Sequence, residues 1–248
     1  MPRDQRLEQL TQLEDRRDLT PDLVRFFVRT VAPARDKTRN GRRRLPSLLV
    51  AVVLSSAQFS GNAQDRMPPI PTPKLTEQQA QALADFVAAR GPPTGPWIAL
   101  LRSPELMTRA RGLSDYLRFE SQVPGWLREF VILMTARQWA QNYEWNAHYA
   151  IAMDEGLSPQ IARAIAEGRR PEGMVAEEEI LYDFCMEMQR NHSVSDATYA
   201  RAVDRFGEQG VIEVVSLMGY YTMISMVLNT SRAPLPEGAV PALSPFPH

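Results

Sequence analysis

The feature that most constrains the fold is a helix-like hydrophobic pattern from Trp126 to Gly156, interrupted only at Gln141-Asn142. Apolar residues recur at three- and four-residue intervals on both sides of this point, which is the spacing of a helix that buries one face. Asn142 is also a good N-cap candidate. We therefore predict two helices in series that fold back on one another near residue 141. Their inner positions are Leu127, Phe130, Val131, Met134, Tyr143, Ala147, Ala150 and Ile151.

Few polar side chains occur in this apolar setting, and they are candidates for chemistry. Gln141, Glu144 and His148 are spaced by three and four residues, so they project from one helical face. On one unbroken helix with a rise of ~1.5 Å per residue, Glu129 would lie roughly 22 Å from Glu144. Only a chain reversal can bring these groups together. The predicted reversal therefore also predicts a shared site for Glu129, Glu144 and His148.

The same stretch resembles the carboxymuconolactone decarboxylase family, which includes the alkyl hydroperoxidase D-like proteins. A Y-E-W-x-x-H core and a later G-Y-Y helix occur here in the order of that family. In its redox branch, a glutamate precedes a Cys-x-x-Cys pair and a histidine. By resemblance the glutamate falls on Glu129, the cysteine positions on Gln141 and Glu144, and the histidine on His148. Both cysteines are missing from this chain.

The resemblance covers roughly residues 75–238 and implies an all-α alkyl hydroperoxidase D-like helical bundle that is oligomeric. No segment of any length has the period of a strand. Residues 209–229 form a nearly all-apolar helix, and a helix that is apolar on every side must be buried on every side. In a protein this small, such burial favours a partner subunit. We therefore predict a homo-oligomer, either a dimer, a trimer or a hexamer.

Four segments are expected along the chain. Residues 1–63 are an N-terminal extension in which residues 42–63 resemble a secretory signal peptide, with a basic run, an apolar run and small residues. Cleavage near Ala63 predicts a periplasmic or secreted protein, whereas retention of residues 1–63 predicts a cytoplasmic one. The apolar run is short for a bilayer, so no stable membrane insertion is expected. A Pro-rich linker, the helical domain and a Pro-rich tail follow at 64–74, 75–232 and 233–248.

Local signals place the first helices of the domain. Thr76 and Gln79 form a capping-box signature that opens a helix to about Arg90. Ser103-Pro104 begins a second helix. Its predicted inner face carries Leu106, Ala110, Leu113 and Leu117.

Composition excludes several classes of function. The net charge of −1 gives no long-range attraction to nucleic acid, and none is expected as a partner. Cys185 is the only cysteine in 248 residues, which excludes an internal disulfide and a Cys-x-x-Cys redox centre. Its apolar neighbours predict a buried, inert thiol. Two carboxylates and one imidazole rarely specify a metal, so neither a metal nor another cofactor is expected.

The predicted function rests on the acid and the imidazole. In an apolar cavity their pKa values move toward neutrality, which suits proton transfer to and from carbon or oxygen. We predict a cofactor-independent carboxy-lyase, or a related proton-transfer enzyme, that acts on a small lactone or keto acid through Glu129, Glu144 and His148. A peroxiredoxin-like hydroperoxide reductase is disfavoured without the thiol pair. A non-catalytic oligomeric protein that binds a small molecule is the third reading. Candidate substrate-binding residues are Gln141, Trp97, Tyr143, Tyr220 and Arg137.

Overall fold

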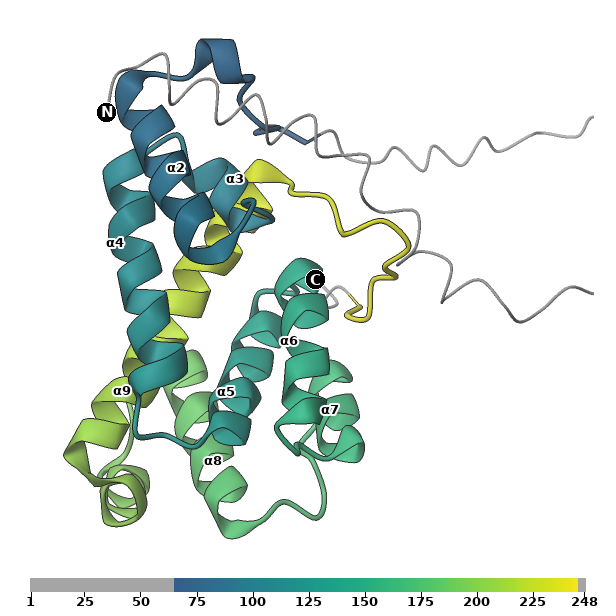
Figure 1. The fold of residues 1–248 in the computed structure, drawn as a ribbon. Coiled ribbons are helices and arrows are strands. Elements are labelled where there is room, and N and C mark those ends of the chain that lie inside the picture. Colours follow the sequence, from purple (N-terminus) through teal and green to yellow (C-terminus); the bar gives the residue numbers. More distant parts are fainter. Residues whose placement is uncertain (1–64, 245–248) are drawn as a thin grey trace, which may run out of the picture. The chain divides into compact units, whose positions relative to one another are not determined.

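A computed structural model describes residues 65–244, and within that range the protein is all-helical, without a strand (Figure 1). The predicted all-α fold is confirmed. The expected signal segment at 42–63, and with it the localisation, lies outside the described residues. The helices in chain order are α2 (Glu77–Arg90), α3 (Pro96–Leu100), α4 (Pro104–Asp115), α5 (Gly125–Gln138), α6 (Asn142–Asp154), α7 (Pro159–Ala166), α8 (Ala176–Asn191) and α9 (Asp196–Ser231), with a 3-10 turn η2 (Thr72–Lys74) and a π-helical turn η3 (Tyr116–Glu120).

The capping box predicted for α2 is confirmed. The Thr76 hydroxyl accepts a hydrogen bond from the Gln79 backbone N–H at 3.2 Å, and the Gln79 side-chain oxygen accepts from the Thr76 N–H at 3.0 Å. These bonds satisfy two of the donors that a helix N-terminus leaves unpaired. Gly91 ends the helix with φ +79°, a conformation that suits glycine.

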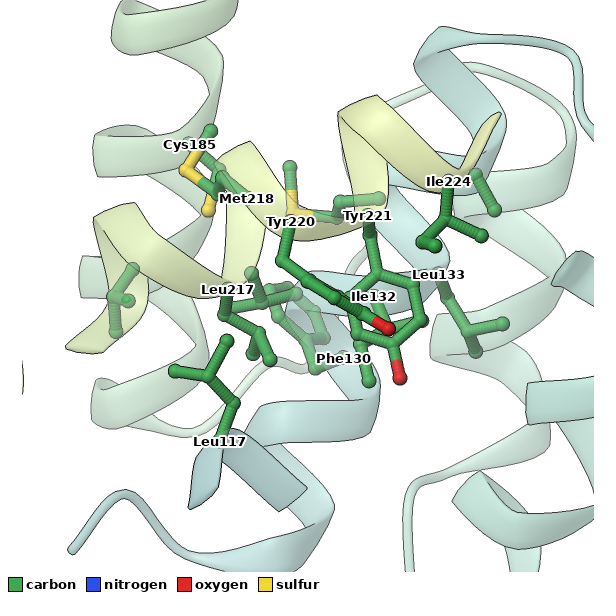
Figure 2. Close-up of a cluster of buried hydrophobic side chains, with 14 of the residues drawn as sticks. Leu117, Phe130, Ile132, Leu133, Cys185, Leu217, Met218, Tyr220, Tyr221 and Ile224 are labelled. Carbon is green, nitrogen blue, oxygen red and sulfur yellow. The ribbon is translucent and has the colours of Figure 1, made fainter. Parts of the chain in front are cut away.

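Helix α5 is the centre of the bundle and is buried on every side. Four consecutive side chains, from Phe130 to Leu133, are 0% exposed. The helix packs against α6, α7, α8 and α9 (Figure 1). The expectation that this helix buries only one face was therefore wrong, because its polar residues are also enclosed. Figure 2 shows α5 side chains such as Phe130 and Ile132 packed beneath α9 residues of the same hydrophobic cluster.

Helix α9 is less enclosed than its composition predicts. A non-helical Gly207 divides it into a first part and a long apolar second part. Ile212 and Met226 on that second part are 64% and 50% exposed. The most apolar window of α9 has the length and composition of a membrane-spanning helix, and 56% of it is buried within the protein. One face of α9 is therefore uncovered in the single chain. The homo-oligomer stays a prediction, and a measurement of the molecular mass in solution tests it.

The chain reverses between α5 and α6 at residues 139–141, close to the predicted position. Ala140 adopts a left-handed conformation with φ +46°, which lets the Gln141 N–H reach the Ala136 carbonyl at 2.8 Å. The N-cap of α6 is Gln141, whose side-chain oxygen accepts from the Tyr143 N–H at 2.7 Å. The prediction of Asn142 as the N-cap was thus wrong by one residue.

Side chains of α9 hold this reversal in place. The Gln141 amide donates to Asn229 at 2.8 Å, and the Asn229 amide donates to the Trp139 carbonyl at 3.2 Å. The Trp139 indole N–H in turn donates to Thr222 at 3.2 Å. Since these hydrogen bonds join α9 to Trp139 and to Gln141, the relative placement of α5 and α6 depends on α9.

The Pro-rich tail lies across α6. Asn142 accepts a hydrogen bond from the Leu243 N–H at 2.8 Å, and Asn146 donates to the Val240 carbonyl at 3.4 Å. Arg137, at the end of α5, donates to the Ser244 carbonyl at 2.6 Å. The tail therefore adds hydrogen bonds to the outer side of the α5–α6 pair.

One buried carboxylate on α9 joins three parts of the chain. Glu213 accepts hydrogen bonds from the Tyr116 hydroxyl at 2.7 Å, the Ser121 hydroxyl at 2.6 Å and the Gln122 N–H at 2.9 Å. Gln209 adds a fourth at 2.8 Å. Burial alone would raise the pKa of Glu213, but these hydrogen bonds outweigh it and hold the pKa below the ordinary value of 4.5. The turn η3 is thus fixed to α9 at both of its ends.

We expect Glu213→Gln to lower the free energy of unfolding by about 1–3 kcal/mol at neutral pH, because four hydrogen-bond donors lose their charged acceptor. A lowered folded-state pKa gives stability that is present above the unfolded pKa and is lost as pH falls through the folded pKa. The difference from wild type should therefore shrink below about pH 4.5. Urea unfolding over a pH series measures this, with the exposed Glu208→Gln as the control. A difference that is constant with pH would contradict the proposed charge state.

Candidate active site

The predicted site residues Glu129 and His148 meet across the α5–α6 pair. His148 Nδ1 lies 2.7 Å from the Glu129 carboxylate, and both side chains are buried. An ionised carboxylate only accepts hydrogen bonds, so Nδ1 is the nitrogen that carries the proton in this contact. Glu129 therefore orients the ring and leaves Nε2 as its reactive nitrogen.

Glu144 approaches the opposite edge of the same imidazole. Its carboxylate lies 3.6 Å from His148 Nε2, within ion-pair range but too far for a hydrogen bond. Burial raises the pKa of Glu144, although the charges of His148 and Arg118 oppose that effect. Glu144 therefore stays protonated to higher pH than an ordinary glutamate and can serve as a buried acid.

These three groups do not converge on one point, because the two carboxylates face opposite ring nitrogens of His148. Among residues 65–244, no group of three or more His, Cys, Asp or Glu side chains is arranged to hold a metal ion. The arrangement instead forms a line in which Glu129 supports the ring and Nε2 faces Glu144.

A cavity of about 210 Å³ opens at the Nε2 side of His148. It lies between the α6 residues that carry the acid and the imidazole, the 90–97 segment, the end of α4 with η3, and α9. This volume suits one small molecule. The lining residues are Arg90, Thr94, Pro96, Trp97, Ser114, Arg118, Tyr143, Glu144, Ala147, His148, Ile151, Tyr220, Tyr221 and Ile224.

Of the predicted substrate-binding residues, Trp97, Tyr143 and Tyr220 line this cavity. Gln141 does not, because its side chain caps α6 and binds α9. Arg137 does not either, because it lies at the C-terminal end of α5 and donates to the Ser244 carbonyl of the tail.

Glu129, predicted as a catalytic residue, also lies behind the cavity and is not part of its wall. Its carboxylate touches His148 on the side away from the space that a ligand would occupy. Its place in the structure is therefore that of a positioning residue, which acts on a ligand only through the imidazole.

The loop before α3 reaches the cavity only because Gly95 has no side chain. A Cβ at this position would lie 2.4 Å from the Tyr143 ring, and the backbone has φ +53°. Both features require glycine. This close approach places Trp97 at the cavity wall, with its ring 4.9 Å from that of Phe86.

Sequence reasoning missed two arginines of the cavity, Arg90 and Arg118. The helix from Ser103 was predicted to bury Leu106 and Leu113, but both are 44% exposed. Its inner side chains are Met107, Ala110 and Ser114, and its regular ladder gives way to the π-helical turn. The sequence did contain a signal for Arg118. It lies four residues after the buried Ser114, so both side chains project from the same side of the helix.

Two tyrosines of α9 close the cavity next to the imidazole. Figure 2 shows the Tyr220 and Tyr221 rings side by side, and their centroids are 5.2 Å apart. The Tyr221 ring meets His148 edge-on, at a centroid distance of 4.9 Å. Burial raises the pKa of Tyr220 to about 12 and that of Tyr221 well above its ordinary range, so both hydroxyls are neutral.

The sole cysteine is remote from this chemistry. Cys185 on α8 is 0% exposed, and burial raises the pKa of its thiol to about 12. It packs among core side chains such as Met218 (Figure 2) and does not line the cavity. A thiolate nucleophile is therefore not available at this position.

Comparison with known proteins identifies the fold. An uncharacterised peroxidase-related protein from Silicibacter sp. TM1040 superposes with a TM-score of 0.56 at 15% identity, over 69% of this chain and 90% of that one. The alkylhydroperoxidase AhpD core protein from Ralstonia eutropha JMP134, also peroxidase-related, gives 0.57 at 16% identity over 69% and 92%. The debrominase Bmp8 in complex with 2,3,4-tribromopyrrole gives 0.56 at 11% identity over 71% and 94%.

The chain therefore has the alkyl hydroperoxidase D-like fold, as its sequence resemblance implied. No protein-family model matches the sequence, and the comparison with curated proteins found no match. The fold is thus defined by the helix arrangement, and the chemistry has to be argued from the residues of the cavity.

We expect Nδ1 of His148 to carry a proton in the folded protein, because it lies 2.7 Å from the Glu129 carboxylate, which accepts the hydrogen bond. Long-range ¹H–¹⁵N correlation spectra can show this, because the chain has only three histidines. Glu129→Gln should produce a mixture of the two neutral tautomers, since an amide can both donate and accept. Glu144→Gln, 3.6 Å from Nε2, should preserve the Nδ1–H form. A wild-type ring protonated only at Nε2 would refute the assignment.

Proposed function

We propose that this protein is a cofactor-independent proton-transfer enzyme, a carboxy-lyase that acts on a small lactone or keto acid. The observation that carries the proposal is the line from Glu129 through His148 to Glu144, which ends in a cavity of about 210 Å³. A buried acid and a positioned imidazole side by side are the groups that proton transfer to carbon requires.

In the proposed reaction, the bond between carbon and the leaving carboxylate breaks and carbon dioxide departs. The electron pair of that bond moves into an adjacent carbonyl or alkene and forms an enolate or dienolate. The protonated ring of His148 donates a hydrogen bond from Nε2 to the developing oxyanion. Glu129 accepts from Nδ1, 2.7 Å away, and balances the positive charge of the ring.

Glu144 then completes the reaction by protonating the carbon that lost carbon dioxide. Burial raises its pKa, which favours the acid form that donates the proton, and its position at the cavity wall puts it within reach of a ligand. Water returns a proton to Glu144 after product release, so each turnover consumes one proton. Glu129 lies behind the imidazole ring and cannot protonate a ligand in the cavity. Of the two glutamates predicted as catalytic, Glu144 is therefore the proton donor in this proposal.

Thiol-dependent peroxide reduction finds no support in the cavity, although two proteins with this fold are described as peroxidase-related. Such a reaction needs a thiolate to attack the oxygen–oxygen bond and a second thiol to resolve the product. Cys185 is fully buried, and the chain has no second cysteine.

We expect wild-type protein to release carbon dioxide from at least one member of a panel of small lactones and keto acids. His148→Ala and Glu144→Gln should each reduce kcat by about 10²-fold or more, because each removes a group from the transition state. A coupled carbon dioxide assay measures the rate, and deuterium incorporation from D₂O at the product carbon reports the proton transfer.

Activity should fall as pH rises through the folded-state pKa of Glu144, because the acid form is the donor. Cys185→Ser is the matched control and should leave the rate unchanged. Ligand binding without turnover in wild type would instead favour the non-catalytic binding protein. Loss of turnover in Cys185→Ser would contradict the proposed mechanism.

A further inference from the structure

One cavity arginine has a hydrogen-bond donor that the protein itself does not satisfy. Arg118 lies in the middle of η3 and lines the cavity with Ser114, four residues earlier. Its Nε is buried and has no hydrogen-bond partner among the described residues, while the guanidinium carbon lies 5.1 Å from the centroid of the neighbouring Phe119 ring. A buried guanidinium donor without an acceptor is costly, so a site of this kind favours a ligand that supplies one.

The second arginine of the cavity shows the contrast. Arg90 binds Asp115 through an ion pair, with Nε 3.1 Å from the carboxylate, and donates to Ser114 at 3.3 Å. Its guanidinium also lies over the Trp97 ring, 5.3 Å from the centroid. Arg90 therefore joins α2 to α4 and supports the cavity wall, while its charge is already balanced.

The other side chains of the cavity wall leave the Arg118 Nε without a hydrogen-bond acceptor. Glu144 is the one carboxylate among the lining residues, and burial raises its pKa although the charge of Arg118 opposes that effect. The Tyr220 and Tyr221 hydroxyls are neutral. The cavity thus carries a positive charge next to a buried acid, which is an environment that attracts an anionic ligand.

We infer that Arg118 forms a carboxylate-binding subsite of this cavity and selects ligands that carry a small ring and a carboxylate. The guanidinium offers parallel N–H donors that match the two oxygens of a carboxylate. Trp97, Tyr143 and Tyr220 line the rest of the cavity and supply flat apolar surface for the ring. The inference deepens the proposed function, on which its mechanistic consequence rests.

That consequence concerns which carboxylate Arg118 holds. A carboxylate that leaves as carbon dioxide loses its charge in the transition state, so an ion pair to it would stabilise the substrate more than the transition state. The carboxylate at Arg118 is therefore one that the reaction leaves in place. Loss of Arg118 should accordingly raise KM more than it lowers kcat.

Glu213 acts as the positioning residue of this subsite. It binds Tyr116 at the first residue of η3, and Ser121 and Gln122 directly after its last residue. A π-helical turn interrupts the regular helical ladder and is frequent at functional sites. Here the carboxylate on α9 holds such a turn at both ends, and Arg118 lies between them.

The test measures binding without turnover, so it can succeed or fail independently of the carbon dioxide assay. Benzoate is the probe and benzamide its uncharged counterpart, titrated by calorimetry. We expect wild type to bind benzoate better than benzamide, and Arg118→Gln to weaken benzoate binding by about tenfold or more with little effect on benzamide. Arg118→Lys should recover part of the affinity, since it keeps the charge but loses the planar fork.

Arg111→Gln removes a charge from α4 outside the cavity and is the matched control, with benzoate binding unchanged. Glu213→Gln should weaken benzoate binding, whereas Glu208→Gln should not. In wild type, benzoate should shift the Nε–Hε signal of Arg118 in the NMR spectrum, which tests the contact even if the variant fails to fold. Equal affinities for benzoate and benzamide, an unchanged affinity in Arg118→Gln or an unshifted Arg118 signal would each overturn the inference.

Discussion

The structure depends on how it accommodates one carboxylate in the middle of its central helix. Glu129 lies in a run of α5 that is enclosed on every side, where an unpaired charge costs several kcal/mol. His148 meets this demand from the neighbouring helix, at 2.7 Å. The bond fixes the register between α5 and α6 and at the same time aims the other ring nitrogen at the cavity. The same hydrogen bond therefore stabilises the folded protein and orients the His148 ring for catalysis.

The remaining polar groups divide into those that shape the cavity and those that face a ligand. Arg90, Glu213 and the Gln141–Asn229 clamp have their hydrogen bonds filled by the protein and join helices that lie far apart in sequence. Glu144 and Arg118 line the cavity, and the Arg118 Nε has a hydrogen-bond donor without a partner. This division explains how a small all-helical domain supports a polar site, since the helices that carry the ligand-facing groups are joined by side chains whose own hydrogen bonds are satisfied.

Local signals in the sequence were sufficient for the secondary structure around the site. The capping box at Thr76 and the chain reversal near residue 141 each depend on a few neighbouring residues, and both occur as expected. The reversal brought Glu129 and His148 together as predicted, because few residues separate the two helices. Periodicity was less informative for burial. It suggested one buried face for α5 and complete burial for α9, whereas α5 is the enclosed helix.

The residues that sequence reasoning misplaced are those whose partners are distant in the chain. Gln141 is bound by Asn229 and Arg137 by Ser244, and neither contact has a local signature. Arg118 was missed because the predicted inner face of α4 included Leu113, whereas the structure buries Ser114, which is four residues before Arg118. Tertiary contacts of this kind override local preference, and a single sequence does not encode them in any periodic pattern.

The late position of α9 in the chain has a consequence for biosynthesis. Tyr220 and Tyr221 on this helix close the cavity, and Asn229 clamps the turn between α5 and α6. On the ribosome, the helix pair that contains Glu129 emerges well before these partners are translated. The nascent chain therefore presents an apolar, unfinished surface until α9 has been translated. Assembly of the cavity has to wait for this helix, and no truncated product that ends before α9 contains a complete cavity.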